Sequence, residues 1–190
     1  NRWTLNERWN KALMPCFHPN TAWYHGEQVK FYPPHYYDRP SYTPTGFKVP
    51  CGQCVGCRAK RTREWSIRIM HEASLHPENS FITLTYDNEH LPDPPQLIKK
   101  HFQLFIRSLR KRIHPKKIRY YHCGEYGEKL GRPHYHAIIF NHSFSDKQKL
   151  NGHKDLYTSK QLSAMWRRGY ASIGMVTPES AAYVANYIQK

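Results

Sequence analysis

The chain has 190 residues, 39% of them hydrophobic and 14% aromatic, which is enough for one good core and short for two full domains. Its 29 Lys and Arg against 14 Asp and Glu give a net charge of +15, and an excess of this size indicates a polyanionic partner, most often nucleic acid. No apolar stretch approaches the ~20 residues that a membrane span needs, and the first residues lack the apolar segment of a secretory signal, so we expect no membrane partner.

The cysteine content indicates the redox compartment. Five cysteines are an odd number, and three of them lie within Cys51–Cys57, too close together for an ordinary disulfide framework. We therefore expect a reducing, cytoplasmic setting. The basic charge alone is also compatible with a merely soluble basic protein, an alternative that only particular residues can exclude.

The first 57 residues are expected to form an irregular N-terminal region that ends in a Cys-rich element, followed by a domain over residues 58–190. Residues 1–50 are rich in Pro and Tyr, as in the run FYPPHYYDRPSY, which is typical of a loop that wraps over a domain or is partly disordered. The aromatic side chains of this region could stack on bases, but we expect them to pack on the core surface.

The Cys-rich element consists of Cys51, Cys54 and Cys57, and three thiolates at this spacing can bind a zinc ion. A closed structural zinc site needs a fourth ligand, for which Cys16 and His18 are the candidates. The alternative is three reduced thiols in a tight turn ahead of a helix.

The middle of the chain begins with a helix, a strand and a second helix. Apolar residues at helical spacing predict the first helix over Arg58–Leu75, with Arg58 and Arg61 on a basic face directed at DNA phosphates or at solvent. Aromatic and β-branched residues predict a strand over Phe81–Tyr86, and an amphipathic pattern predicts a helix over Gln96–Ile113. The second helix ends in basic residues, which stabilise the helix dipole.

The last third of the chain is predicted to begin with a hairpin. The pattern predicts, in order, a strand over Lys117–Cys123, a hairpin connection, a strand in Gly131–Phe140, a polar inserted loop over 141–157, a short helix over Thr158–Arg168 and a strand over Tyr170–Val176. Thr177, Pro178 and Glu179 then predict a helix start, because they supply a hydroxyl cap, a proline in the first turn and an acid near the N-terminus.

This order of elements indicates the fold class. Strands alternating with helices, with a hairpin in the middle, predict an α+β fold with an antiparallel sheet of about five strands, of the split βαβ, ferredoxin-like kind. We expect the helices to cover one side of the sheet and to leave the other face free for a ligand.

The strand within Gly131–Phe140 carries His134 and His136, and alternate residues of a strand point to the same face. Two imidazoles on a rigid strand can hold one divalent ion, although His-x-His arises by chance about once in a chain with 13 His. The predicted hairpin brings Glu125 beside the pair, which completes a site of two imidazoles and one carboxylate. Glu128 is the rival carboxylate, but its place deeper in the turn favours solvation.

Tyr183 and Tyr187 are four residues apart on the last predicted helix, so both side chains project from one face and their hydroxyls could serve one site. The same spacing occurs in Tyr32 and Tyr36, but those residues lie in the Pro-rich loop and are treated as coincidental. The alternative for Tyr183 and Tyr187 is a pair of aromatic residues in a core stripe.

Three segments together carry a resemblance to a known family. FITLTYD, GRPHYHAIIF and YVANYIQK occur in this order, and they resemble the three motifs of the rolling-circle replication initiators among the HUH endonucleases. The paired Tyr followed by Lys is most similar to the initiators of the microviruses. The Cys-rich element and the MPCFHP segment at Met14 resemble the gokushovirus branch of that group.

The resemblance implies an endonuclease and strand transferase that nicks single-stranded DNA at a replication origin and remains linked to the 5′ phosphate. His134 and His136 match the metal-binding pair, with Glu125 as the third ligand of Mg²⁺ or Mn²⁺. Tyr183 and Tyr187 match the two nucleophiles.

Lys190 matches the lysine that follows these tyrosines, where it would favour the phenolate and neutralise a phosphate oxygen. The candidate DNA contacts are Arg132, Lys129, Arg58 and Arg61. A phage initiator would act in the cytoplasm of its bacterial host, on the phage origin, with a host helicase and polymerase as further partners. Because initiators usually continue beyond this point, the chain would be the nuclease part of a longer protein.

Two other functions fit the same residues. One is a non-catalytic single-stranded nucleic-acid-binding module, in which the sheet face binds bases and the two histidines are incidental. The other is a transposase or relaxase that uses the same chemistry on a different DNA substrate.

Overall fold

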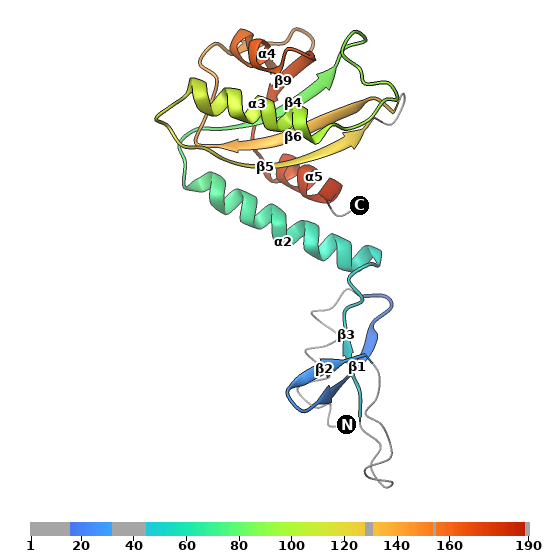
Figure 1. Ribbon diagram of the computed structural model, residues 1–190. Coiled ribbons are helices and arrows are strands. Elements are labelled where there is room, and N and C mark those ends of the chain that lie inside the picture. The colour runs from blue at the N-terminus through green and yellow to red at the C-terminus, as the bar shows by residue number, and fades with distance from the viewer. Residues whose placement is uncertain (1–15, 32–44, 128–130, 154, 189–190) are drawn as a thin grey trace. The chain divides into compact units, whose positions relative to one another are not determined.

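The computed structural model describes residues 16–31, 45–127, 131–153 and 155–188, and the chain divides into two compact units, Asn1–Arg61 and Thr62–Lys190. Each unit is described by itself. The elements of both are labelled in Figure 1. The pair Tyr32 and Tyr36 lies outside the described residues.

The described part of the first unit holds a three-stranded antiparallel sheet in the order β2-β1-β3. Its strands are β1 (Asn20–His25), β2 (Gln28–Lys30) and β3 (Phe47–Val49). His25 pairs with Gln28, so β1 and β2 are joined by a two-residue loop that begins at Gly26, whose φ is +65°. A glycine at the first position of such a loop is a hairpin signal, because only glycine adopts positive φ without steric cost.

The expectation of an irregular region over residues 1–50 is therefore wrong for these three segments. Two of the strands have only three residues, and the surrounding Pro and Tyr residues concealed the alternation that would have predicted them. Tyr24 of β1 stacks on Phe47 of β3, with ring centroids 4.7 Å apart, so aromatic packing joins the two strands.

The described part of the second unit forms one six-stranded sheet in the order β5-β6-β4-β9-β8-β7, and its printed strand pairs are antiparallel. The strands are β4 (Asn79–Tyr86), β5 (Arg119–Tyr126), β6 (Pro133–Phe140), β7 (Gln148–Lys149), β8 (Tyr157–Thr158) and β9 (Gly169–Gly174). The α+β fold with an antiparallel sheet is confirmed. The expected inserted loop over 141–157 instead contributes β7 and the first residue of β8, strands too short to leave a periodic pattern.

The helices of the described chain are α2 (Val55–Ser74), α3 (Lys99–Arg112), α4 (Lys160–Trp166) and α5 (Pro178–Ile188). Helix α3 begins three residues later than predicted because Ile98, with φ −109° and ψ 99°, is still extended after the Pro-rich segment. Helix α5 begins with the expected hydroxyl cap: Thr177 Oγ1 accepts a hydrogen bond from Ser180 N at 3.2 Å, and Ser180 Oγ accepts one from Thr177 N at 2.9 Å.

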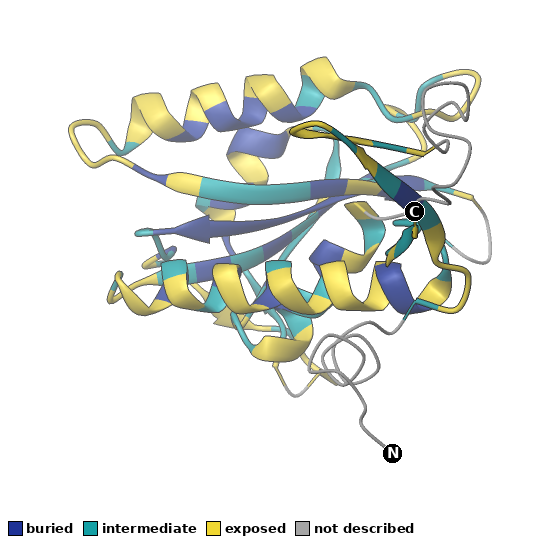
Figure 2. Ribbon diagram, turned by 90° about the horizontal axis from the view of Figure 1, so that it is seen from below, coloured by how far each residue is buried: buried dark blue, intermediate teal, exposed yellow. Residues whose placement is uncertain are grey.

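Helices pack on both faces of the six-stranded sheet, so the expectation of one free face is wrong. On one face, α3 and α4 pack on alternate residues of the strands, including Leu84, Ala137 and Ile139. On the other face, α5 and residues 62–74 of α2 pack on Cys123, Ile138 and Phe140. Figure 2 shows helices with exposed outer sides on both sides of the sheet.

Strand β6 explains this double coverage. Seven of its eight residues are buried, the exception being His134. A strand with apolar side chains at both alternations must be covered on both faces. The sequence Ala137-Ile138-Ile139-Phe140 therefore already requires a second helical layer, and the last helix of the chain supplies it.

Candidate active site

Strands β5 and β6 place three candidate metal ligands on one face of the sheet. Glu125 of β5 is directly opposite His134 of β6 in the antiparallel register, and His136 follows two residues later on the same face. Glu125 Oε1 lies 3.0 Å from His134 Nε2 and 3.5 Å from His136 Nε2. The three ligand atoms lie within 4.8 Å of one another, so the structure brings together the predicted set.

Glu125 is buried, with 8% of its surface exposed. Burial alone would raise its pKa, but hydrogen bonds from His134 and Tyr183 outweigh this effect and hold the pKa of the carboxyl below its ordinary value. Glu125 is therefore an ionised acceptor at neutral pH. An ionised carboxylate between two imidazoles is suited to a divalent cation.

His136 is oriented by a neighbouring strand. Its Nδ1 lies 2.9 Å from Thr83 Oγ1 of β4, a hydrogen bond that directs Nε2 toward Glu125. Nε2 itself is buried and has no hydrogen-bond partner among the described residues. Burial lowers the pKa of His136 to about 4, so the imidazole is neutral and its free nitrogen carries a lone pair at neutral pH. A buried, unpartnered imidazole nitrogen next to a carboxylate fits a metal ligand.

Gly127, at the end of β5, leaves room for the His134 ring. A Cβ at this position would lie 3.0 Å from His134 Cε1, which is tighter than ordinary side-chain contacts. A larger residue here would displace the imidazole.

Helix α5 brings Tyr183 and Tyr187 to the same place. Its buried side consists of Ala181, Val184 and Ala185, and the small alanines allow the helix to lie close to β5 and β6. The Tyr183 hydroxyl donates to Glu125 and lies 3.0 Å from both carboxylate oxygens.

The second tyrosine lies one turn away from the first. The Tyr187 ring centroid is 4.9 Å from that of Tyr183, whose own ring is 5.1 Å from the His136 ring. Burial, followed by the hydrogen bond to Glu125, raises the pKa of Tyr183 above its ordinary value. Phe81 of β4 stacks on the His136 ring at 5.8 Å and meets Tyr183 edge-on, so the ligands and the hydroxyl form one packed group.

The predicted DNA contacts have different surroundings. Arg132 donates from Nη1 to Tyr86 O at 2.9 Å and from Nη2 to Asn88 Oδ1 at 2.6 Å, so its guanidinium joins the β5–β6 hairpin to the end of β4. Arg58 is exposed on α2, and Arg61 donates to Gly52 O at 3.1 Å, both in the first unit. Lys129, Lys190 and the rival carboxylate Glu128 lie outside the described residues.

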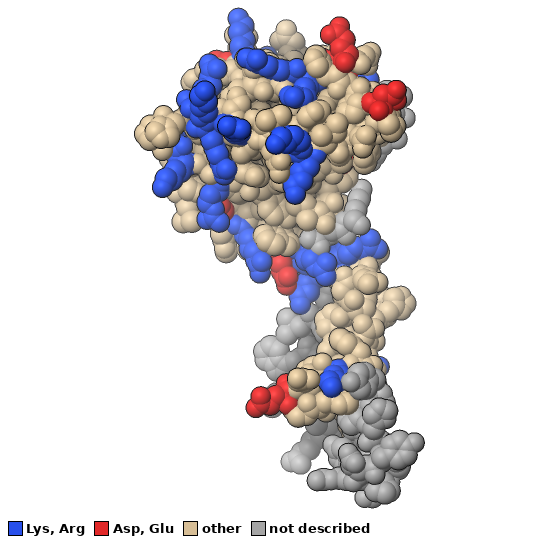
Figure 3. Space-filling view, in the orientation of Figure 1, with Lys and Arg blue, Asp and Glu red and all other residues tan. Residues whose placement is uncertain are grey.

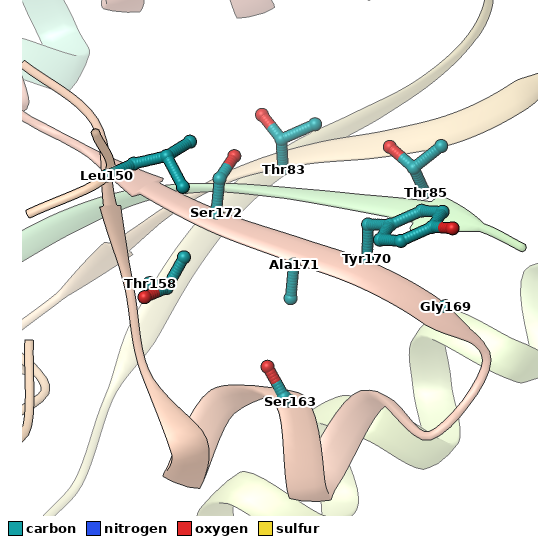
Figure 4. Close-up of a pocket in the computed structure, with 9 residues that line it drawn as sticks. All are labelled: Thr83, Thr85, Leu150, Thr158, Ser163, Gly169, Tyr170, Ala171 and Ser172. Carbon is teal, nitrogen blue, oxygen red and sulfur yellow. The ribbon is translucent and has the colours of Figure 1, made fainter. Parts of the chain in front are cut away.

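A polar cavity of about 310 Å³ lies beside the ligand group and was not predicted. Thr83 and Thr85 of β4 and Tyr170 and Ser172 of β9 point to the same side of the sheet along it (Figure 4). The signal was present in FITLTY, where the two threonines alternate with apolar residues and pair with His136 and His134 across the sheet.

The Cys-rich element forms a second group in the described chain. Cys16, Cys51, Cys54 and Cys57 have their sulfur atoms within 4.8 Å of one another, all within the first unit. Of the two predicted fourth ligands, the structure brings Cys16 into the group, and His18 is exposed outside it.

No described helix combines the length and the apolar character that crossing a membrane would require.

Comparisons with known proteins identify similar sequences. The sequence model of the replication-associated protein ORF2 family matches residues 79–190, a segment that contains β4, the His pair and both tyrosines of α5. The chain is 40% identical over 153 residues to the Replication-associated protein ORF2 of Spiroplasma virus 4, covering 75% of this chain and 48% of that protein. It is 39% identical over 155 residues to the Replication-associated protein VP4 of Bdellovibrio phage phiMH2K, covering 76% and 49%.

A third relative is the Replication-associated protein ORF4 of Chlamydia phage 1, 36% identical over 154 residues, which cover 76% of this chain and 38% of that protein. The chain thus spans about half the length, or less, of the curated relatives it matches. No solved structure matches the chain significantly.

Proposed function

Because the chain belongs to the replication-associated protein ORF2 family, we propose that it is a metal-dependent tyrosine endonuclease and strand transferase of the HUH type that starts rolling-circle replication of a phage genome. Its substrate would be single-stranded DNA at the phage origin, in the cytoplasm of the bacterial host. A host helicase and polymerase would then extend the strand.

One observation carries this proposal: the Tyr183 hydroxyl lies 3.0 Å from both oxygens of Glu125, which itself contacts the His134 and His136 imidazoles. A nucleophile, a proton acceptor and a candidate metal site are therefore within one hydrogen-bonded group. A pair of tyrosines in a core stripe would not require this contact with a buried, ionised carboxylate.

The residues suit attack on a phosphodiester. A tyrosine with an ordinary pKa near 10 is only about 0.1% phenolate at pH 7, so it needs a group that takes its proton. Glu125 accepts the hydrogen bond from Tyr183 and is the described group in position to do so. The Tyr183 oxygen would form a bond to phosphorus while the bond to the 3′ oxygen breaks, and the proton would end on that 3′ oxygen.

This step would leave a 5′-phosphotyrosine and a free 3′-OH that can prime synthesis. The ester bond retains the energy of the phosphodiester, so a later 3′-OH could reseal the strand without ATP. A divalent ion held by His134, His136 and Glu125 would polarise the scissile phosphate and stabilise its charge in the transition state. Oxygen ligands from phosphate favour Mg²⁺ or Mn²⁺, and two imidazoles favour Mn²⁺ of these two.

The two tyrosines would act in sequence. Tyr183 bonds to the carboxylate, so we assign it the first cleavage, and Tyr187, with its ring 4.9 Å away on the same helix face, the second. Two nucleophiles would allow one protein to cut a new strand while still holding the old one. Lys190 is proposed to favour the phenolate of Tyr187, one turn before it.

The surface of the second unit suits a polyanion. Figure 3 shows Lys and Arg side chains gathered over the face that α3 covers, where the exposed basic residues are Lys99, Lys100, Arg107, Arg110, Lys111 and Arg112. The cavity of Thr83, Thr85, Tyr170 and Ser172 beside the ligands offers hydroxyl donors to a phosphate of the strand. We assign Arg132, Lys129, Arg58 and Arg61 to further phosphate contacts.

A covalent-adduct assay tests the proposal. The protein is incubated with a labelled pool of single-stranded DNA and Mn²⁺ and then run on a denaturing gel, beside Tyr183→Phe, Tyr187→Phe, the double variant and His136→Ala. We expect a protein–DNA band that survives denaturation, needs the metal, weakens most in Tyr183→Phe among the single tyrosine variants and disappears in the double variant. Tyr120→Phe is the matched control, because Tyr120 lies on β5 with its side chain on the opposite face of the sheet.

Two outcomes would contradict the proposal. Absence of an adduct with DNA binding retained would favour the non-catalytic binding module. An adduct formed only on DNA hairpins or on a conjugative origin would favour a transposase or relaxase instead.

A further inference from the structure

We propose that Cys16, Cys51, Cys54 and Cys57 bind one Zn²⁺ in a closed four-thiolate site, and that this ion holds the first unit of the chain together. The four residues come from two places in the sequence, a segment just before β1 and the element that ends at the start of α2. The site is separate from the proposed nuclease centre, which lies in the second unit.

The distances match tetrahedral zinc. With Zn–S bonds of about 2.3 Å, two sulfurs of a tetrahedral site lie about 3.8 Å apart. Cys54 Sγ and Cys16 Sγ are 3.9 Å apart, and the four sulfurs all lie within 4.8 Å of one another. All four cysteines are free, so none of these sulfurs is occupied by a disulfide.

The backbone around the cluster donates to the sulfurs, as it does where thiolates are held. Cys51 N donates to Cys16 Sγ at 3.3 Å, and Phe17 N donates to Cys54 Sγ at 3.4 Å, so each arm of the cluster supports a sulfur of the other. Gln53 N and Cys54 N both donate to Cys51 Sγ, at 3.5 and 3.4 Å. Hydrogen bonds to sulfur stabilise the thiolate, which is the form that binds metal.

Gly52 makes this double donation possible. Its φ is +76°, a conformation that other residues rarely adopt, and it turns the backbone so that the next two N–H groups face Cys51. Arg61 of α2 donates to Gly52 O at 3.1 Å and so supports the same turn. The turn is thus built around a sulfur.

The first unit needs such a site because its described part has almost no core. Among the described residues up to Arg61, only Ala22, Gly56 and Cys57 are buried. Three short strands without an apolar interior do not hold a fold in water, and small domains of this kind use metals or disulfides instead. Because Cys16 precedes β1 and Cys57 lies in the first turn of α2, one ion would connect the sheet to the helix start.

Metal content of the full chain tests the inference. Glu125→Ala/His134→Ala/His136→Ala, which lacks the other candidate site, is purified without added metal and assayed by elemental analysis. We expect one zinc per chain, and a cobalt-substituted sample with the absorption of a tetrahedral thiolate site. Since this variant has no nuclease site, the result does not depend on the proposed function.

Single variants in the same background identify the ligands. Cys16→Ser is expected to lose the zinc, and Cys16→His to retain it, because imidazole can replace one thiolate. Cys123→Ser is the matched control, because this fifth cysteine is buried in the second unit, and it should keep one zinc per chain. His18→Gln should keep it as well.

Several results would overturn the inference. Less than about one-tenth of a zinc per chain in the first variant, together with four thiols that react at once with a thiol reagent, would exclude a bound metal. Iron in place of zinc would make the cluster an iron site. Loss of zinc in His18→Gln but not in Cys16→Ser would replace the assigned fourth ligand. Cobalt absorption typical of fewer thiolates would exclude the four-cysteine set even if a serine variant fails to fold.

Discussion

Replacing Thr83 by valine would remove the hydroxyl that orients His136 and change little else. Valine has the same branched shape and the same preference for a strand, so β4 should keep its place in the sheet. What is lost is the 2.9 Å hydrogen bond from Thr83 Oγ1 to His136 Nδ1, which sets the direction of Nε2. We therefore expect the variant to bind Mn²⁺ more weakly while it remains folded.

The size of the effect follows from what else holds the ring. Removing a partner that orients a metal-binding histidine typically lowers metal affinity by about 10–100-fold. Phe81 still stacks on the His136 ring, with an interplanar angle of 9°, so the ring plane keeps one support. We therefore expect the lower part of the range, about 10–30-fold, which corresponds to about 1.4–2 kcal/mol.

Calorimetric titration of Mn²⁺ into the protein without DNA measures this affinity directly. Thr83→Ser keeps the hydroxyl and should bind Mn²⁺ nearly as the unmodified protein does. Thr85→Val is the neighbouring control, since Thr85 pairs with His134 in the sheet but makes no hydrogen bond to either imidazole among those the structure shows. Equal Mn²⁺ affinity of Thr83→Val and the unmodified protein would refute the orienting role of Thr83 and weaken the assignment of His136 as a ligand.

Two further predictions concern stability. Burial lowers the pKa of His136 to about 4 from an ordinary value near 6.5, so the unfolded chain binds more protons between these values, and stability without added Mg²⁺ or Mn²⁺ should be complete above pH 6.5 and fall by at most about 3 kcal/mol toward pH 4. Urea unfolding at pH 7.5 and 5 should show this fall and a smaller one in His136→Asn; an unchanged fall in that variant would assign it to other groups. Tyr121→Phe should raise the free energy of unfolding by about 1 kcal/mol, because the buried Tyr121 hydroxyl has no hydrogen-bond partner among the described residues. Tyr120→Phe should leave that free energy unchanged, and a destabilised Tyr121→Phe would mean that the hydroxyl does have a partner.

The elements that the sequence predicted well are those with a local, periodic cause. The strand in Phe81–Tyr86, the helix stripe with Phe102 and Phe105 and the capped start of α5 all depend on residues close together in the chain. The His134–His136 pair shares this advantage, because alternation along one strand places both on one face whatever the rest of the fold does. Elements of two or three residues, such as β2 and β7, are too short for a period and were missed.

Contacts between distant segments were decided by tertiary structure. Glu125 faces His134 because the β5–β6 register places it there, and a shift by one residue would turn its carboxylate to the other face. Thr83 reaches His136 only because β4 lies beside β6, an order that no local pattern specifies. The contact of Tyr183 with Glu125 needs α5 on the same face, and the Cys16 position in the cysteine cluster needs two segments 35 residues apart to meet.

The sequence by itself therefore determined which residue types were available for chemistry and how they alternate along each element. The tertiary structure decided which of them meet, because pairing register and helix packing depend on the whole buried core rather than on neighbours in the chain.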